Sequence, residues 1–415
     1  MKSVIWIWFV LILVNAKAQN ISYAEAERIS YRLFVQGRWD DLITYGHKVI
    51  YEGVDFYYLR VRLGEAYMAK GKYRVAVKHL RKALEDNSFE DVFTIGLLYR
   101  AYLMSGQYVK AHALKKYLAE DDKTLIDAVS FYFGMGKAEN TVPEPVNEPV
   151  RKLDKTSSYI GRLYMYKKSR LWTVTANMGI SGERFYFRNK NNVIENTPYQ
   201  SKMTAISFDK TVDAGKAFLF SFGFNPVWAS SYNAVETASL TFRPSFVSGD
   251  NSKYTLIKTR NFIGNAVIGL TYYGTFCDVG AMTSLSYSTG TVYPWFGSVN
   301  GFITFYPLAN NKWYLGIKIG SIFSGKNGKT IYSAFAGFNT KFFGWEGYYY
   351  RASDDMNYWY EGQGIFYLSN FPVVSAGGMR LQVFLSKKVT LFGGCGFVNY
   401  DIRSSGGDAG FVFSF

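Results

Sequence analysis

The sequence predicts a multidomain protein in which all-α helical repeats precede an antiparallel transmembrane β-barrel. Three observations lead to this fold class. Glycines recur about every 34 residues in the first third of the chain. From Thr156 onward, apolar and polar residues alternate, as they do in strands with one apolar face. The chain then ends in GDAGFVFSF, with Phe411, Phe413 and Phe415 spaced two residues apart.

The first eighteen residues have the features of a secretory signal. Lys2 supplies a positive charge, Val4–Val14 is an unbroken apolar run, and Ala16-Lys17-Ala18 forms a cleavage site. A bilayer-spanning helix needs about 20 apolar residues, and this run is shorter. We therefore expect residues 1–18 to be removed and the mature protein to leave the cytoplasm.

Charge is distributed unequally along the chain. Residues 19–150 have no net charge, whereas residues 151–415 carry a net charge of +13. The basic character therefore belongs to the C-terminal part, and no nucleic-acid partner is expected. Two cysteines, Cys277 and Cys395, are too few for a disulfide framework, and both a single bridge and two free thiols remain open.

The repeats of the N-terminal part share a register. Gly37, Gly71 and Gly106 are separated by 34 and 35 residues, and an aromatic residue follows two positions after each. The aromatic residues are Trp39, Tyr73 and Tyr108, and Leu42, Ala76 and Ala111 come three positions later. This pattern resembles the tetratricopeptide (TPR) family, with L-G-x-x-Y followed by G-x-Y-x-x-A. The alternative is three unrelated amphipathic helix pairs.

The resemblance to TPR repeats implies a concave groove that holds a periplasmic protein partner. The family's groove positions fall on Tyr58, Glu65, Met68, Arg100 and Met104. The alternative for each of these residues is ordinary helix surface or packing between repeats.

A proline-rich stretch follows the repeats. Residues 140–155 contain Pro143, Pro145 and Pro149, and this density favours an extended spacer. The sequence therefore divides into a signal peptide (1–18), a TPR-like domain (19–139), a Pro-rich linker (140–155) and a β-barrel (156–415).

In several segments of the C-terminal part, apolar and polar or small residues alternate strictly along the chain. In AFLFSFGF (217–224) four phenylalanines share one face, and WYLGIKIG (313–320) sets Lys318 against apolar neighbours. Strands of about 10 residues with turns and loops predict roughly 12 to 14 strands over this length. The terminal Phe411, Phe413 and Phe415 resemble the last strand of bacterial outer-membrane barrels, which the barrel-assembly machinery recognises. The resemblance implies the outer membrane of a Gram-negative bacterium, with lipid around the barrel and the N-terminal domain in the periplasm.

The barrel lacks the residue types that most hydrolases use. All three histidines, His47, His79 and His112, lie in the repeats, where a solvated helix surface is the expected environment. Asp354 and Asp355 are adjacent and point to opposite faces of an extended strand. We expect no enzyme activity, no metal and no cofactor.

The polar faces of the predicted strands suggest what lines the barrel. The candidate lumen residues are Arg162, Asp209, Arg243, Lys318, Glu361, Arg380 and Gln382. One interpretation is an internal ion-pair network that fills the barrel. The other is a cationic path for anionic solutes or an anionic glycan.

In architecture the chain is similar to YaiO-like outer-membrane proteins and to the exporters of cellulose, poly-N-acetylglucosamine and alginate. This resemblance implies a non-enzymatic barrel whose TPR-like module recruits partners for export or assembly of a surface polysaccharide or protein. The alternative is a selective channel for anionic solutes. An outer-membrane enzyme that uses carboxylates is the third hypothesis.

Overall fold

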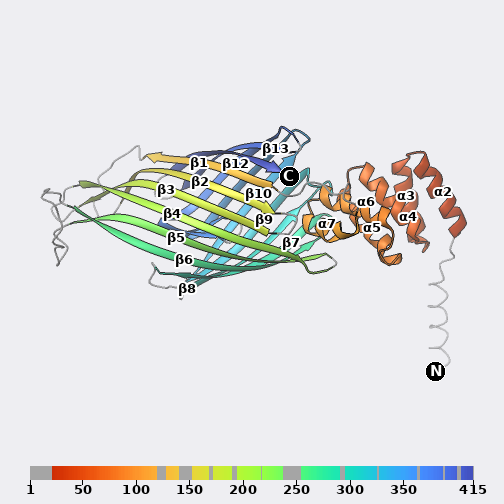
Figure 1. Ribbon diagram of the computed structural model, residues 1–415, viewed down its shortest axis with the longest axis horizontal. Helices are drawn as coiled ribbons and strands as arrows, with labels where there is room; N and C mark the ends of the chain where they lie inside the picture. Colours follow the sequence, from red (N-terminus) through yellow and green to blue (C-terminus); the bar gives the residue numbers. More distant parts are fainter. Residues whose placement is uncertain are drawn as a thin grey trace, which may run out of the picture. The chain divides into compact units, whose positions relative to one another are not determined.

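The protein consists of paired helices followed by a closed antiparallel β-barrel, as a computed structural model shows (Figure 1). The two parts are separate compact units, one mainly on residues 1–123 and the other mainly on residues 124–415. This confirms the predicted order of a helical part before a barrel. The structure describes residues 21–118, 128–139, 152–167, 172–188, 194–215, 217–236, 254–289, 295–324, 327–361, 365–386, 388–399 and 403–414.

The described part of the helical unit contains six α-helices and one short 3-10 helix. They are α2 (Tyr23–Val35), α3 (Trp39–Tyr51), α4 (Tyr57–Ala69), α5 (Tyr73–Asp86), α6 (Val92–Met104), α7 (Tyr108–Leu114) and η1 (Lys115–Tyr117). Polar side chains begin two of the helices: Ser22 Oγ accepts the Glu25 N–H at α2, and the Asp91 carboxylate accepts the Phe93 N–H at α6. In the described part of the chain, no helix combines the length and the apolar character that crossing a membrane requires.

The three periodic glycines make the same turn inside three successive helix pairs. In the second pair, the Gly71 N–H donates to the Met68 carbonyl (3.0 Å) and the Lys72 N–H donates to the Tyr67 carbonyl (2.9 Å). Gly71 has φ of 70°, a left-handed conformation that glycine adopts without steric cost. The same two bonds and a positive φ recur at Gly37 and Gly106. The sequence period is therefore a structural period of one helix pair.

Small residues allow the helices to pack closely. Ala76 on α5 and Ala111 on α7, the small residues of the sequence pattern, are fully buried. Leu80 and Leu98 join α5 to α6 in the same core cluster and are at most 1% exposed. Burying one such leucine contributes about 1.5–3 kcal/mol, so the apolar faces rather than the surface ion pairs hold the repeats together.

The described residues of the barrel unit form fourteen strands, at the upper end of the predicted range. Each strand pairs antiparallel with its neighbours in sequence, and β1 pairs with β14 to close the sheet. The strands are β1 (Ala128–Glu139), β2 (Lys152–Lys167), β3 (Trp172–Arg188), β4 (Ile194–Asp213), β5 (Phe218–Glu236), β6 (Tyr254–Tyr273), β7 (Cys277–Ser288), β8 (Trp295–Phe305), β9 (Trp313–Ser324), β10 (Asn327–Asn339), β11 (Phe343–Glu361), β12 (Ile365–Phe384), β13 (Val389–Asn399) and β14 (Arg403–Ser414).

The barrel begins earlier than the sequence boundaries predicted. Strand β1 occupies residues 128–139, which were assigned to the helical domain, and β2 begins inside the stretch assigned to the linker. The physical reason is closure: β14 needs a partner, and Phe131 lies opposite Phe411 while Val129 lies opposite Phe413. The expected barrel-domain boundary at residue 156 is therefore corrected.

The Pro-rich stretch also has a different position from the one expected. It does not separate the domains but connects β1 to β2 within the barrel unit. Together with the connection between β5 and β6 (residues 237–253), it belongs to the barrel end opposite Ala128 and Ser414. The end with Ala128 and Ser414 carries short turns such as 274–276 and 340–342. Long connections at one end and short turns at the other are typical of outer-membrane barrels.

The outer face of the barrel is apolar, with aromatic residues towards both ends. Phe220 and Phe222 on β5 are 41% and 44% exposed. Trp295 starts β8 and Trp313 starts β9, at opposite ends of the barrel, and both are more than half exposed. An apolar band flanked by aromatic girdles is the arrangement that lipid requires.

The turn at Gly71 gives a test of the repeat geometry. An added Cβ there meets nothing within 4 Å, so Gly71→Ala changes only the backbone preference. We expect Gly71→Ala to lower the free energy of unfolding of the helical unit by about 1 kcal/mol. The measurement is urea denaturation of the full protein followed by its helical circular dichroism. Gly96→Ala, inside α6 with only Leu118 near its new Cβ, is the matched control and should not destabilise. An equal loss of unfolding free energy in Gly71→Ala and Gly96→Ala would show that the left-handed turn at Gly71 is not what makes its substitution costly.

Candidate functional site: the inner wall of the barrel

Alternate residues of each strand form the inner wall of the closed barrel. On β5, Phe222 and Phe224 face outwards, whereas Leu219, Asn225 and Val227 are at most 4% exposed. Because successive side chains of a strand point to opposite faces, the second set lies inside the barrel. The cross-strand register then extends this inner face from strand to strand.

Two aromatic side chains of this wall lie against glycines of the neighbouring strand. The Phe302 ring lies against Gly280, where an added Cβ would be 2.4 Å from Phe302 Cζ. The Phe335 ring lies against Gly316 in the same way, with a corresponding distance of 2.3 Å. Any side chain at either glycine would displace the ring. The inner wall therefore presents aromatic faces on neighbouring parts of β8 and β10.

A neutral polar layer lies on the inner faces of β6, β7 and β8. The Ser284 and Ser298 hydroxyls share a hydrogen bond of 2.8 Å, and Asn300 Nδ2 donates to Ser298 Oγ (3.1 Å). Ser286 Oγ donates to Asn265 Oδ1 (2.8 Å). All five residues are buried, so their hydroxyl and amide groups form part of the interior rather than a solvated surface.

Acidic and basic side chains are interleaved on the inner wall. Tyr314 Oη donates to Glu346 Oε2 (2.6 Å), and Glu346 lies opposite Arg380 in the β11–β12 register. The Arg380 guanidinium lies 5.3 Å from the centre of the Phe392 ring. Asp278 is 4% exposed and accepts from Tyr306 Oη (3.0 Å). The described wall is therefore not a cationic lining.

The structure places the described lumen candidates on five strands, with Arg380 and Gln382 both on β12. Asp209, Lys318, Arg380 and Gln382 belong to the inner face of β4, β9 and β12. Arg162 and Glu361 lie within β2 and β11 and pair in register with Tyr132 and Ile365, and Arg243 lies outside the described residues. The prediction missed Asp278 and Glu346. In the β7 sequence CDVGAMTSLSYS, Asp278 is on the same face as the other polar residues, and this alternation could have identified it.

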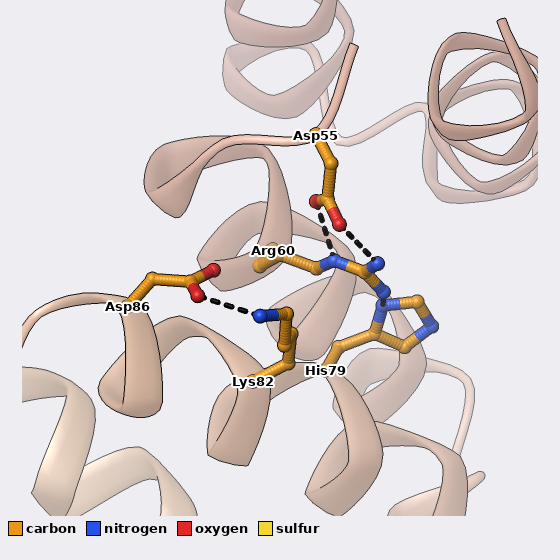
Figure 2. Close-up of polar contacts among 5 residues, drawn as sticks. All are labelled: Asp55, Arg60, His79, Lys82 and Asp86. Carbon is orange, nitrogen blue, oxygen red and sulfur yellow. Dashed lines mark hydrogen bonds and ion pairs between the residues drawn. The ribbon is translucent and has the colours of Figure 1, made fainter. Parts of the chain in front are cut away.

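The helical unit holds a second polar cluster, around Arg60 (Figure 2). Arg60 donates to both Asp55 carboxylate oxygens, at 2.7 and 2.6 Å, and its Nη1 lies 3.1 Å from His79 Nδ1. Since the guanidinium has only donors, His79 Nδ1 is the acceptor in this pair. Lys82 bonds to Asp86 one turn apart on α5, beside this cluster.

His79 is buried between aromatic and cationic neighbours. Its ring stacks on Tyr67 with centroids 5.3 Å apart and lies 5.6 Å from the His47 ring. Burial and the Arg60 charge lower the pKa of His79 to about 3. The expected solvated surface is therefore wrong for His79, which is 2% exposed. In the described residues, no group of three or more His, Cys, Asp and Glu side chains is placed to hold a metal ion.

The predicted groove residues come from α4 and α6. Tyr58 and Met104 are exposed, and Glu65 and Met68 are half-buried. Arg100 lies on the exposed side of α6. The prediction missed Arg62, which forms an ion pair with Glu27 (2.6 Å) and lies over the Tyr31 and Tyr58 rings. Cys277 and Cys395 are both free thiols.

No protein-family model and no curated protein matches the chain. Solved structures resemble it in fold. A TodX deltaS2S3 mutant, described as a monoaromatic hydrocarbon channel, is 12% identical over 70% of this chain and 90% of its own, with a TM-score of 0.44. The P. putida toluene transporter TodX is 10% identical over 75% and 93%, with a TM-score of 0.41. A Pseudomonas aeruginosa FadL homologue is 10% identical over 70% and 89%, with a TM-score of 0.37. The barrel fold itself is defined by the closed antiparallel pairing of the fourteen described strands.

The function expected from the sequence is corrected at this point. A partner-recruiting component for polysaccharide or protein export was expected, with an anion channel as the alternative. The described inner wall departs from an anion path, because Asp209, Asp278 and Glu346 accompany Lys318 and Arg380. The export and anion-channel hypotheses are therefore not retained.

The His79 cluster predicts a pH dependence of the helical unit. The folded state keeps His79 neutral, whereas the unfolded chain binds a proton near the ordinary pKa of 6.5. Stability is therefore fully present above about pH 6.5 and is lost as the pH falls towards 3, by roughly 1.4 kcal/mol per pH unit. Of the neighbouring groups, the positive charges of Arg60, Lys78 and protonated His47 oppose protonation of His79, and the Asp55 carboxylate partly favours it.

The measurement is urea denaturation at pH 7 and pH 5, followed by helical circular dichroism. The free energy of unfolding of the wild-type helical unit should fall by about 2 kcal/mol from pH 7 to pH 5. In His79→Gln nearly all of this pH-dependent fall should disappear. His47→Gln is the matched control and should change the loss less, because His47 is exposed. A His79→Gln variant with the wild-type pH dependence would show that the buried imidazole does not control stability.

Proposed function

We propose that the protein is an outer-membrane channel for small uncharged solutes that carry an aromatic or apolar part. The observation that carries this proposal is the pair of aromatic rings, Phe302 and Phe335, that lie against glycines on the inner wall. A solute ring packs against such a face with about 0.5–1.5 kcal/mol beyond the area that it buries. The neutral hydroxyl and amide layer beside the rings repels neither sign of charge strongly.

The arrangement of charges supports an uncharged solute. An anion entering the barrel meets Asp209, Asp278 and Glu346 as well as the two cationic side chains, so its passage gains little from the wall. A neutral solute loses less hydration on entry than an ion does. The preference for uncharged solutes therefore follows from the mixture of acidic and basic side chains on the wall as well as from its aromatic rings.

We propose further roles for the parts outside the barrel wall. Residues 1–18 direct export, and the helical unit is a TPR-like module in the periplasm that binds a protein partner through the face bearing Tyr58, Glu65 and Met68. The glycine turn repeated in three helix pairs supports the TPR-like assignment. Phe411, Phe413 and Phe415 are the signal for the barrel-assembly machinery, which agrees with the outward position of the first two.

Solute uptake by intact Gram-negative cells tests the channel. We expect cells that produce the protein to take up radiolabelled toluene several-fold faster than cells without it, and benzoate no faster. Toluene and benzoate share a ring and differ in charge, so each controls for the other. Faster uptake of benzoate than of toluene would contradict the proposal.

A pair of substitutions at Phe335 tests the role of the ring. Phe335→Glu places a carboxylate on the inner wall and should reduce toluene uptake at least fivefold. The reason is that a hydrated carboxylate then replaces the apolar ring against which toluene packs. Phe335→Leu keeps an apolar side chain and should reduce uptake less than twofold. Barrel folding is checked by heat-modifiable electrophoretic mobility. Equal uptake by the two variants would show that this part of the wall does not contact the solute.

A further inference from the structure

We propose that the inner wall around Asn225 and Asp209 is a hydrogen-bonding site that selects hydroxylated aromatic solutes, of the benzyl alcohol type, over plain hydrocarbons. The inference rests on the proposed channel function and adds the chemistry of its solute. Four features of β4, β5 and their neighbours carry it.

The first feature is the buried amide of Asn225. This side chain is 1% exposed and faces the barrel interior, and among the described residues neither its Oδ1 nor its Nδ2 has a protein hydrogen-bonding partner. A buried carboxamide without partners is costly, and folded proteins retain such groups where a ligand or a functional demand accounts for them. Asn225 therefore supplies an acceptor and two donors to the interior.

The second feature is the contrast with Asn265, directly opposite on β6. The two asparagines are paired in the β5–β6 register and are equally buried. Asn265 Oδ1 accepts from Ser286 Oγ (2.8 Å), so its amide is part of the neutral polar layer. Ser298 and Asn300 are bonded within the same layer. The unused hydrogen-bonding capacity at Asn225 is therefore a local property and not a general feature of the wall.

The third feature is the Asp209 carboxyl group on β4. It lies against Gly223, where an added Cβ would be 2.2 Å from Asp209 Oδ1. Its Oδ2 atom is buried and has no protein hydrogen-bonding partner in the described part of the chain. Gly223 precedes Asn225 by two residues on the same strand face, so both unpartnered groups belong to one part of the wall.

The fourth feature is an interruption of the β4–β5 ladder beside Asn225. The pairing is continuous to Ala205 opposite Val227 and resumes at Phe208 opposite Phe224. Pro226 lies within the gap and has no N–H to donate. The gap in the ladder therefore lies beside the unpartnered Asn225 amide, in the same part of the wall.

These groups match a hydroxyl better than other functional groups. A hydroxyl donates to Asp209 Oδ2 or Asn225 Oδ1 and accepts from Asn225 Nδ2, so it uses both kinds of atom. A plain hydrocarbon makes none of these bonds. An ammonium group cannot accept from Nδ2, and a carboxylate is repelled by Asp209. The aromatic rest of the solute packs on the rings of the inner wall.

Binding to the full-length mature protein in detergent micelles tests the proposal. Ligand-observed NMR titrations with benzyl alcohol, toluene and benzylamine give the dissociation constants. The wild-type protein should prefer benzyl alcohol to toluene, and Asn225→Leu should weaken benzyl alcohol binding about fivefold to tenfold while toluene binding stays unchanged. Asn225→Ser replaces the amide with a hydroxyl, which can still donate and accept, and should retain part of the preference.

Asn300→Leu is the matched control, since it removes an inner-wall amide that already bonds to Ser298. It should leave the ratio of the two affinities unchanged, and heat-modifiable mobility confirms that each variant folds. An unchanged ratio in Asn225→Leu and Asn225→Ser would overturn the proposal, as would tightest binding of benzylamine. Toluene uptake by cells separates the two claims: if toluene enters but benzyl alcohol is not preferred, only this inference fails.

Discussion

Closure of the sheet by β1 and β14 is the constraint on which the rest of the barrel depends. Within lipid, an unpaired backbone N–H or C=O costs several kcal/mol, so a spanning sheet cannot leave an edge open. The ten cross-strand pairs from Ala128 opposite Ser414 to Lys137 opposite Ser405 remove that edge. The aromatic residues near the end of the chain belong to this seam, where Phe411 and Phe413 lie on the outer face. Closure thus explains why the last strand is not left to fray.

Closure also determines what the wall presents on each side. Successive side chains of each strand point alternately outwards and into the barrel, so a residue's position in this alternation decides its environment. Outward positions carry phenylalanine and leucine, and inward positions combine glycine, serine and asparagine with aromatic rings. Glycine at positions such as Gly280 and Gly316 is what allows a ring to lie on the wall. The described interior therefore combines aromatic rings and neutral polar groups with interleaved acidic and basic side chains, which favours neither sign of charge.

Much of the fold could be predicted from the sequence because its signals are periodic. The glycine spacing led to the helix pairs, and the alternation in AFLFSFGF and WYLGIKIG led to strands β5 and β9. Residues 128–139 were missed although VSFYFGMGK alternates, because the Pro-rich stretch after them has the composition of a linker. The identity of the first strand depends on pairing with residues almost 300 positions away, as in Phe131 opposite Phe411, and local pattern carries no such information.

The site was predicted less completely, for a related reason. The alternation of polar and apolar residues predicted Lys318 and Arg380 as inward residues, but the neighbours of these residues depend on the cross-strand register. That register places Glu346 opposite Arg380 and changes a cationic path into a mixed one. Similarly, the burial of His79 depends on the packing of α5 beside Tyr67 and Arg60, which its position on an amphipathic helix did not reveal.

The central claim is that the barrel passes small uncharged solutes and does not select anions. The most direct measurement is the reversal potential of the mature protein in a planar bilayer across a salt gradient, combined with block of the current by added toluene. The account predicts a reversal potential close to zero and a current that toluene reduces, because rings and balanced charges line the wall. A strongly anion-selective reversal potential that toluene does not affect would contradict it.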